Sequence, residues 1–158
     1  MKKYIFFIFS IFLVACNSTK KIDSQSVYDN YDYSTIDVLS DNFKSEHILV
    51  SNKEGTQLEA GSVILFITTD GDLGKMEIVS VNPDENYKIS FNYTVYNNDG
   101  SVKITKENFG LRGTWVFDFD KGTDEAASSE NDIWNNRVDD FETYLGTENE
   151  ILILLIQK

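Results

Sequence analysis

The segment Tyr87-Lys-Ile-Ser-Phe-Asn-Tyr-Thr-Val-Tyr96 decides the fold class, because bulky apolar side chains occupy every second position along it. A period of two is typical of a β-strand that buries one face and exposes the other. Aromatic rings dominate the apolar face, and such rings pack well on the pleated surface of a sheet. We therefore expect this strand to lie against the core of a β-rich protein.

The residues that follow this strand predict a hairpin. The sequence Asn97-Asn-Asp-Gly100 supplies residues that tolerate the positive φ angles of tight turns. A two-residue loop at Asp99-Gly100 sets Val95 opposite Ile104, so that Ile104 extends the aromatic face. A register shifted by one residue would turn Ile104 away from that face.

Further strand patterns lie on both sides of this hairpin. They are β-branched or alternating apolar stretches bounded by turn residues, and they cover residues 46–50, 62–68, 75–81, 114–119 and 151–156. The last of these is continuously apolar, which predicts an interior strand. Together the patterns predict a mainly β (α+β) protein of about seven or eight mostly antiparallel strands, arranged as a sheet, a sandwich or a partial barrel.

The pattern changes near the carboxyl end, where a helix is expected over about residues 130–145. Apolar residues there have the spacing of one helical stripe; they are Trp134, Val138, Phe141 and Leu145. Ser129 suits the N-cap of this helix and Gly146 suits its C-terminal cap. We expect the helix to pack near the final strand.

The first sixteen residues carry the pattern of an export signal. Lys2 and Lys3 form a basic start, and residues 4–14 are apolar except for one serine. A helix of that length covers roughly half of a ~30 Å hydrocarbon core, so it is too short for a stable membrane-spanning helix. A basic start followed by a short apolar run and a small residue is typical of a secretory signal peptide.

The end of this signal, Leu13-Val14-Ala15-Cys16, resembles the lipobox of bacterial lipoproteins. The resemblance implies that the Cys16 thiol receives a diacylglycerol, that residues 1–15 are removed as a signal peptide, and that the new amino terminus is acylated. Two or more acyl chains anchor a protein stably. Cys16 is the only cysteine, so an internal disulfide is excluded. The alternatives are an ordinary secretory signal that ends by chance in a cysteine, and an uncleaved anchor.

The residue after the cysteine bears on localisation. In many diderm bacteria an Asp there retains a lipoprotein in the inner membrane, and this chain has Asn17, so the resemblance implies the outer membrane and leaves the leaflet open. Residues 16–40 are polar, which predicts a tether or a loosely packed segment. Residues 41–158 are expected to form a single β-rich domain, the natural count at this length.

Composition excludes several classes of function. The 158-residue chain carries 14 Lys and Arg against 26 Asp and Glu, a formal net charge of −12. The signal segment contains two lysines and no acidic residue, so its removal takes the charge to −14. Such acidity argues against binding to nucleic acid. His47 is the only histidine, which rules out a zinc site built from several histidines, and no glycine-rich phosphate loop is present.

The sharpest chemical pattern is an acidic segment. Asp118, Asp120 and Asp124 are candidate oxygen ligands for Ca²⁺, with Gly122 at the bend. The match to a calcium loop is incomplete, because the glycine stands one place early and the twelfth position is Ser129 rather than Glu. A solvated strand end is the alternative interpretation, and no other cofactor is expected.

No catalytic residue is assigned, and the expected function is a lipid-anchored, non-enzymatic binding or structural module of the cell envelope. Its expected partners are the membrane, through Cys16, and an envelope protein or glycan. Two alternatives stay open: a small hydrolase that uses paired carboxylates on a glycan, and a calcium-stabilised adhesion domain. The stretches Gly74-Lys-Met76, Arg112-Gly-Thr-Trp115 and Asp118-Phe-Asp-Lys-Gly122 also resemble parts of small exported bacterial β domains without assigned activity, which implies no site.

Overall fold

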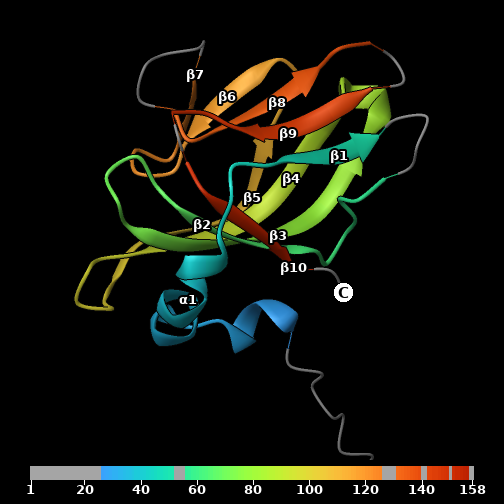
Figure 1. Cartoon of the computed structure of the whole chain (residues 1–158). Helices are drawn as coiled ribbons and strands as arrows, with labels where there is room; N and C mark the ends of the chain where they lie inside the picture. Colours follow the sequence, from blue (N-terminus) through green and yellow to red (C-terminus); the bar gives the residue numbers. More distant parts are fainter. Residues whose placement is uncertain (1–25, 52–55, 126–130, 140–141, 150, 157–158) are drawn as a thin grey trace, which may run out of the picture.

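The computed structural model describes residues 26–51, 56–125, 131–139, 142–149 and 151–156, and it contains two five-stranded antiparallel sheets packed face to face (Figure 1). Sheet I has the order β1 (His47–Ser51), β9 (Thr143–Thr147), β8 (Ile133–Arg137), β6 (Trp115–Asp118) and β7 (Thr123–Glu125). Sheet II has the order β10 (Ile153–Ile156), β2 (Val63–Ile67), β3 (Leu73–Asn82), β4 (Lys88–Tyr96) and β5 (Val102–Leu111). The remaining elements are α1 (Tyr33–Leu39) and the 3₁₀ turns η1 (Val27–Asn30), η2 (Ser40–Asn42) and η3 (Pro83–Glu85). The mainly β fold is confirmed, and the arrangement is a sandwich.

The core lies between the two sheets and is rich in aromatic side chains. Phe66 of β2 stacks on Phe119 with ring centroids 3.9 Å apart, and Phe117 of β6 packs edge-on against Phe119 at 5.1 Å. Phe91 and Tyr93 of β4 contact the same rings and are fully buried. Burying one such side chain contributes roughly 1.5–3 kcal/mol, so this cluster is a main source of stability.

The β4–β5 hairpin has the predicted register but a longer loop. Val95 pairs with Ile104, which places Ile104 against the core. The Gly100 N–H donates to the Asn97 carbonyl and the Asn97 N–H donates to the Ser101 carbonyl, both at 2.8 Å, so the loop exceeds two residues. A bulge between Val95 and Tyr96 absorbs the difference, and the predicted register holds from Val95 to Tyr93, where a second irregularity follows.

The helix predicted over about 130–145 is wrong, because the described part of this region forms β8 and β9. The two strands pair antiparallel, with Asn135 opposite Leu145. Trp134 lies on β8 and Leu145 lies on β9, so their helix-like spacing in the sequence is accidental. Phe141 and Ser129, which the helical interpretation also used, lie outside the described residues.

The strand period of this hairpin is hidden in the sequence because polar residues occupy inward positions. Asn135 and Thr143 are fully buried at the positions where alternation calls for apolar side chains. The Asn135 side chain donates to the Tyr87 carbonyl at 2.8 Å, which ties β8 to the residue before β4. This bond satisfies the Asn135 amide nitrogen, whereas Asn135 Oδ1 and the Thr143 hydroxyl are buried without a hydrogen-bond partner among the described residues. Buried polar side chains of this kind weaken the apolar alternation by which a strand is recognised in a sequence.

The final apolar segment forms β10 at the edge of sheet II, rather than in its interior. β10 pairs with β2, and beyond it only a single bridge, from Ile153 to Lys44, occurs within the described chain. Both faces of β10 are nevertheless covered. Ile153 belongs to the core between the sheets, whereas Leu154 packs on the opposite face. The apolar run thus reflects burial on both faces.

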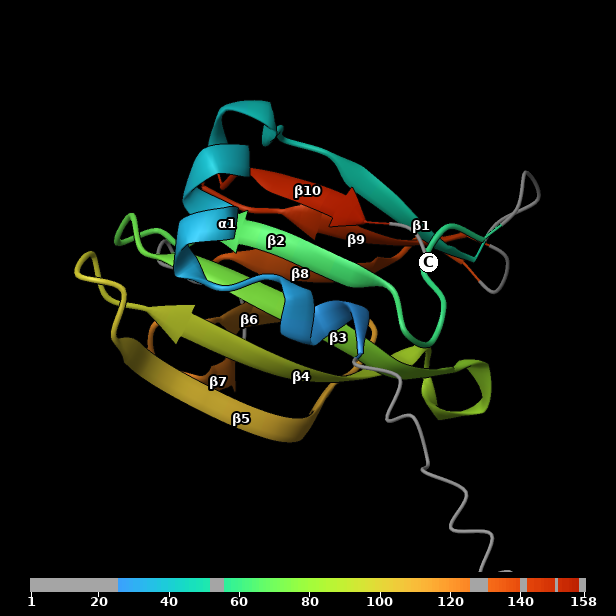
Figure 2. The same cartoon turned by 90° about the horizontal axis from the view of Figure 1, so that it is seen from below.

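The cover on the outer face of sheet II comes from α1, which lies across it (Figure 2). Ile36 of α1 is fully buried and packs in an apolar cluster with Val63 and Leu65 of β2. Asp32 caps the helix by accepting from the Thr35 N–H at 2.9 Å, and hydrogen bonds from the Thr35 hydroxyl and amide lower the pKa of Asp32 to about 2. The later part of the polar segment 16–40 therefore packs on the domain.

None of the helices in the described ranges has the length and apolar character needed to cross a membrane.

Candidate functional site

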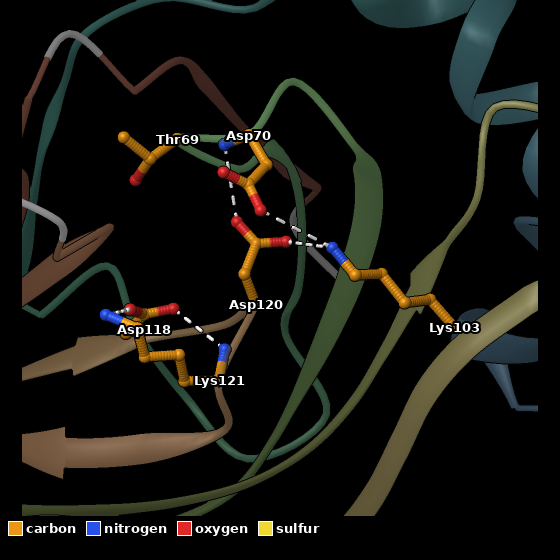
Figure 3. A pocket seen from close by; sticks show the side chains of 6 residues that line it. All are labelled: Thr69, Asp70, Lys103, Asp118, Asp120 and Lys121. Atoms are coloured by element: carbon orange, nitrogen blue, oxygen red, sulfur yellow. Dashed lines mark hydrogen bonds and ion pairs between the residues drawn. The ribbon is translucent and has the colours of Figure 1, made fainter.

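Loops from both sheets meet in a group of charged side chains at one end of the sandwich. We call this group the polar junction; it consists of Thr69, Asp70, Asp72, Lys103, Asp118, Asp120, Lys121 and Asp132. The first three come from the β2–β3 turn and Lys103 from the start of β5. Asp118 is the last residue of β6, the next two lie in the β6–β7 turn, and Asp132 directly precedes β8. Part of the junction lines a hollow of about 300 Å³. Figure 3 shows the side chains that line it.

Lys103 connects the turns of the two sheets. Its ammonium group donates to Asp72 Oδ2 at 2.6 Å and to Asp120 Oδ1 at 2.8 Å, and Asp70 Oδ2 lies 3.7 Å away. In Figure 3, the carboxylates of Asp70 and Asp120 both point toward the Lys103 ammonium group. The hydrogen bonds with Asp120 and Asp72 hold the pKa of Lys103 above its ordinary value. Lys103 is therefore a permanent positive charge shared by carboxylates from both sheets.

Asp132 is fully buried and makes a second connection between the sheets. The Thr69 N–H and hydroxyl both donate to its Oδ1 at 2.7 Å, and the Phe119 N–H donates to its Oδ2 at 2.6 Å. Thr69 follows β2 of sheet II, whereas Phe119 follows β6 of sheet I. One carboxyl group thus satisfies three donors that come from different sheets.

Asp118 shapes the β6–β7 turn. Its Oδ1 accepts from the Lys121 N–H at 2.9 Å, and its Oδ2 lies 3.1 Å from the Lys121 ammonium. The Gly122 N–H donates to the Asp118 carbonyl at 2.8 Å. Gly122 has a φ of +67°, and a Cβ at this position would lie 2.5 Å from the Tyr93 hydroxyl. Glycine is required here for its conformation and for its lack of a side chain.

The structure brings together two of the three residues expected to bind calcium, and adds a different third. Asp118, Asp120 and Asp132 each offer a carboxylate oxygen, and these oxygens lie within 4.8 Å of one another. Asp124 is not part of this group, because it lies on β7 opposite Phe117 rather than in the turn. Carboxylates this close can share one cation. Each of them also accepts hydrogen bonds from the protein, so the group is satisfied as a structural junction.

Sequence reasoning missed the place of Asp132 because it assigned this residue to the start of a helix. A strand assignment for residues 133–137 would have placed Asp132 directly before the strand, in the loop that leads into it. The available signal was the alternation of Ile133, Asn135 and Arg137, which two polar side chains made weak.

The spacing of the three carboxylates does not match glycoside hydrolysis. Retaining glycosidases place two carboxyl groups about 5–5.5 Å apart and inverting ones about 6.5–9.5 Å apart, on either side of the substrate. Asp118, Asp120 and Asp132 approach more closely than this, and Asp118 and Asp132 are only 2% and 0% exposed. The polar junction therefore gives the hydrolase alternative no support.

The buried carboxyl of Asp132 predicts a pH dependence of stability. Burial raises the pKa of Asp132 to about 6, although the hydrogen bonds from Thr69 and Phe119 oppose the rise. The folded state then binds this proton more tightly than the unfolded state. Its stabilising contribution is complete below about pH 4 and is lost as the pH rises through about 6, a change of roughly 3 kcal/mol. The side chain introduced by Asp132→Asn does not titrate, so we expect the unfolding free energy of the wild type, measured relative to that of this variant, to fall by this amount between pH 4 and pH 7 in denaturant titrations. A constant difference would contradict the prediction.

The other residues singled out from the sequence lie elsewhere. His47 is an exposed residue of β1, at the opposite edge of sheet I from β7, and its ring centroid lies 6.2 Å from that of Tyr144. Cys16 and the segment 13–16 that resembles a lipobox lie outside the described residues. Comparison with known proteins finds no matching family model, no similar curated protein and no matching solved structure.

Proposed function

We propose that this chain is a lipoprotein of the bacterial envelope, anchored through Cys16, and that its β-sandwich works at the membrane as a non-enzymatic binding or structural module. The observation that carries the proposal is the lipobox Leu13-Val14-Ala15-Cys16. The cysteine stands where the apolar signal segment ends, and the chain has no other cysteine. A cysteine placed by chance could fall anywhere in the chain, so its position directly after the signal segment favours a lipobox.

The proposed anchor keeps the domain close to the membrane. Residues 17–26 lie between the proposed lipid on Cys16 and η1, and at full extension ten residues span at most about 35 Å. Asn17 supports the outer membrane as the location. The strongly acidic domain supports a role that involves no nucleic acid and no adhesion of the sandwich to anionic lipid.

Replacing Cys16 by alanine is expected to release the protein from the membrane fraction, because the acyl chains supply the binding energy. The measurement is the distribution of the full-length protein between membrane and soluble fractions after cell lysis. Ser18→Ala is the matched control and is expected to stay with the membrane. Membrane retention of Cys16→Ala would contradict lipid anchoring and favour an uncleaved anchor.

A calcium-stabilised domain is the second candidate, because three carboxylate oxygens of the polar junction lie within 4.8 Å of one another. A cation that binds only the folded state stabilises it by mass action. This candidate predicts that calcium raises the unfolding midpoint above its value in chelator, and that Asp132→Asn abolishes the rise. Equal midpoints with calcium and with chelator would remove it.

A further inference from the structure

The end of the sandwich opposite the polar junction carries a strained turn. Lys103 of the junction lies near the start of β5, whereas the segment Arg112–Trp115 follows the end of that strand and leads into β6. The Trp115 N–H donates to the Arg112 carbonyl at 3.2 Å, which closes the turn. Thr114 has a φ of +71°. A positive φ is rare for a β-branched residue and persists only where the surroundings impose it.

Neighbouring segments hold this turn from two sides. The Gly113 N–H donates to the Asn86 carbonyl at 2.9 Å, and the Asn86 side chain donates to the Gly113 carbonyl at 2.9 Å. The Thr114 N–H donates to the Asn135 carbonyl of β8 at 2.6 Å. A Cβ on Gly113 would lie 2.4 Å from the Asn86 carbonyl oxygen, so this contact needs glycine. The turn is a rigid platform rather than a loose connection.

The platform presents an arginine whose donors are free. The Arg112 side chain is exposed, and its guanidinium carbon lies 4.2 Å from the centroid of the Trp115 ring. Within the described ranges the guanidinium group makes no hydrogen bond and no ion pair, although the chain has 26 acidic residues. Stacking on the indole orients the planar group, and its N–H groups face solvent.

The second arginine of the chain lies beside the same platform. Arg137 donates to the Asn86 side chain, whose amide in turn donates to Gly113, and its guanidinium carbon lies 5.5 Å from the centroid of the Tyr87 ring. Both arginines of this acidic protein therefore converge on one turn. The net charge of −12 repels anions in general, so an anion that binds here must be held by this local arrangement.

We propose that the turn Arg112–Trp115 is the recognition point of the module, and that it binds an acidic group, a carboxylate or a phosphate, on an envelope component. The guanidinium fork of Arg112 offers two parallel donors, which match two oxygens of such a group. The Thr114 side chain is exposed beside it. This proposal rests on the proposed function, since it supplies the partner chemistry of the binding module.

The test uses the full chain purified in detergent, observed by ¹⁵N–¹H spectroscopy of the arginine Nε–H and tryptophan indole signals. The chain has two residues of each kind, so every signal can be assigned by single substitution. The probes share one sugar ring: glucuronate carries a carboxylate, glucose 6-phosphate carries a phosphate, and glucose is neutral. We expect saturable shifts of the Arg112 and Trp115 signals with an acidic probe and none with glucose. The stronger acidic probe identifies the acidic group.

Three variants separate recognition from general electrostatics. Arg112→Lys keeps the charge but loses the fork, and is expected to weaken binding about tenfold. Arg112→Gln is expected to abolish the shift of Trp115, whereas Lys44→Gln removes the same charge elsewhere and is expected to leave binding unchanged. An unchanged unfolding midpoint shows that each variant folds.

Several results would overturn the proposal. They are the absence of saturable shifts, an equal response to glucose, or shifts reproduced by sodium chloride at the same ionic strength. None of these results depends on Cys16. A negative outcome with a lipidated protein therefore rejects recognition by the turn Arg112–Trp115 and leaves the proposed lipid anchor unaffected.

Discussion

Replacing Asp132 by alanine is expected to lower the free energy of unfolding by roughly 3 kcal/mol at pH 5, because three donors lose their acceptor at once. The Thr69 N–H, the Thr69 hydroxyl and the Phe119 N–H all point at this carboxyl group. They belong to turns of different sheets, so no nearby acceptor replaces the lost one without a shift of the sandwich. Denaturant titration followed by tryptophan fluorescence measures the effect.

Asp124→Ala is the matched control for this substitution. Asp124 was also a predicted ligand in the acidic segment, but it lies on β7 outside the group of three carboxylates. We expect its replacement to change the unfolding free energy by no more than about 0.5 kcal/mol. Equal losses for the two variants would mean that the polar junction does not hold the sheets together.

Replacing Gly74 by alanine is expected to cost about 3 kcal/mol, because the added methyl group has no room. A Cβ on Gly74 would lie 2.3 Å from Cε2 of the Phe66 ring and 3.0 Å from the Thr94 carbonyl oxygen. Phe66 is fully buried and stacks on Phe119, so it cannot move away without disturbing the centre of the core. Thermal and denaturant unfolding of the purified variant measure the loss.

Gly110→Ala distinguishes a clash in the core from a clash at the surface. A Cβ on Gly110 would lie 2.6 Å from Cε of Lys88, a similarly short distance. The Lys88 side chain is 37% exposed and flexible, so it can move aside. We expect a change within about 0.5 kcal/mol. If Gly74→Ala proved equally mild, the close packing of Phe66 against β3 would be incorrect.

The fold class and the central hairpin were predictable from the sequence, because their residues obey local rules. Alternation along residues 87–96 specifies which side chains face the core, and Val95 pairs with Ile104 as that alternation requires. The predicted loop was wrong in length, yet the register held. Burial of the aromatic face determines the pairing, and a bulge adjusts the loop to it.

The predictions from the sequence were wrong or incomplete where tertiary contacts, rather than local patterns, determine the structure. Asn135 and Thr143 occupy core positions of β8 and β9. Their polar side chains break the alternation of a strand, and the apolar residues that remain have a spacing close to that of a helix. Asp132 joins the candidate site only because two sheets bring Thr69 and Phe119 to it, and sequence spacing contains no information about that meeting. A pairing between elements far apart in the chain leaves no periodic signal.

The packing of α1 could be predicted only in part. Its segment reads as polar, and the Asp32 cap is a local signal for a helix start. The burial of Ile36 depends on apolar side chains on the outer face of β2, which the continuously apolar strand 62–68 does indicate. Connecting the two facts requires the three-dimensional arrangement.

The most direct test of lipid anchoring is the intact mass of the protein extracted from membranes of cells that express the natural sequence, beside the Cys16→Ala variant. Anchoring through Cys16 predicts a mass equal to residues 16–158 plus a diacylglyceryl group and an amino-terminal acyl chain. In the Cys16→Ala variant this mass is absent. A wild-type mass without lipid, recovered from the soluble fraction, would contradict lipid anchoring and return the chain to the class of secreted proteins.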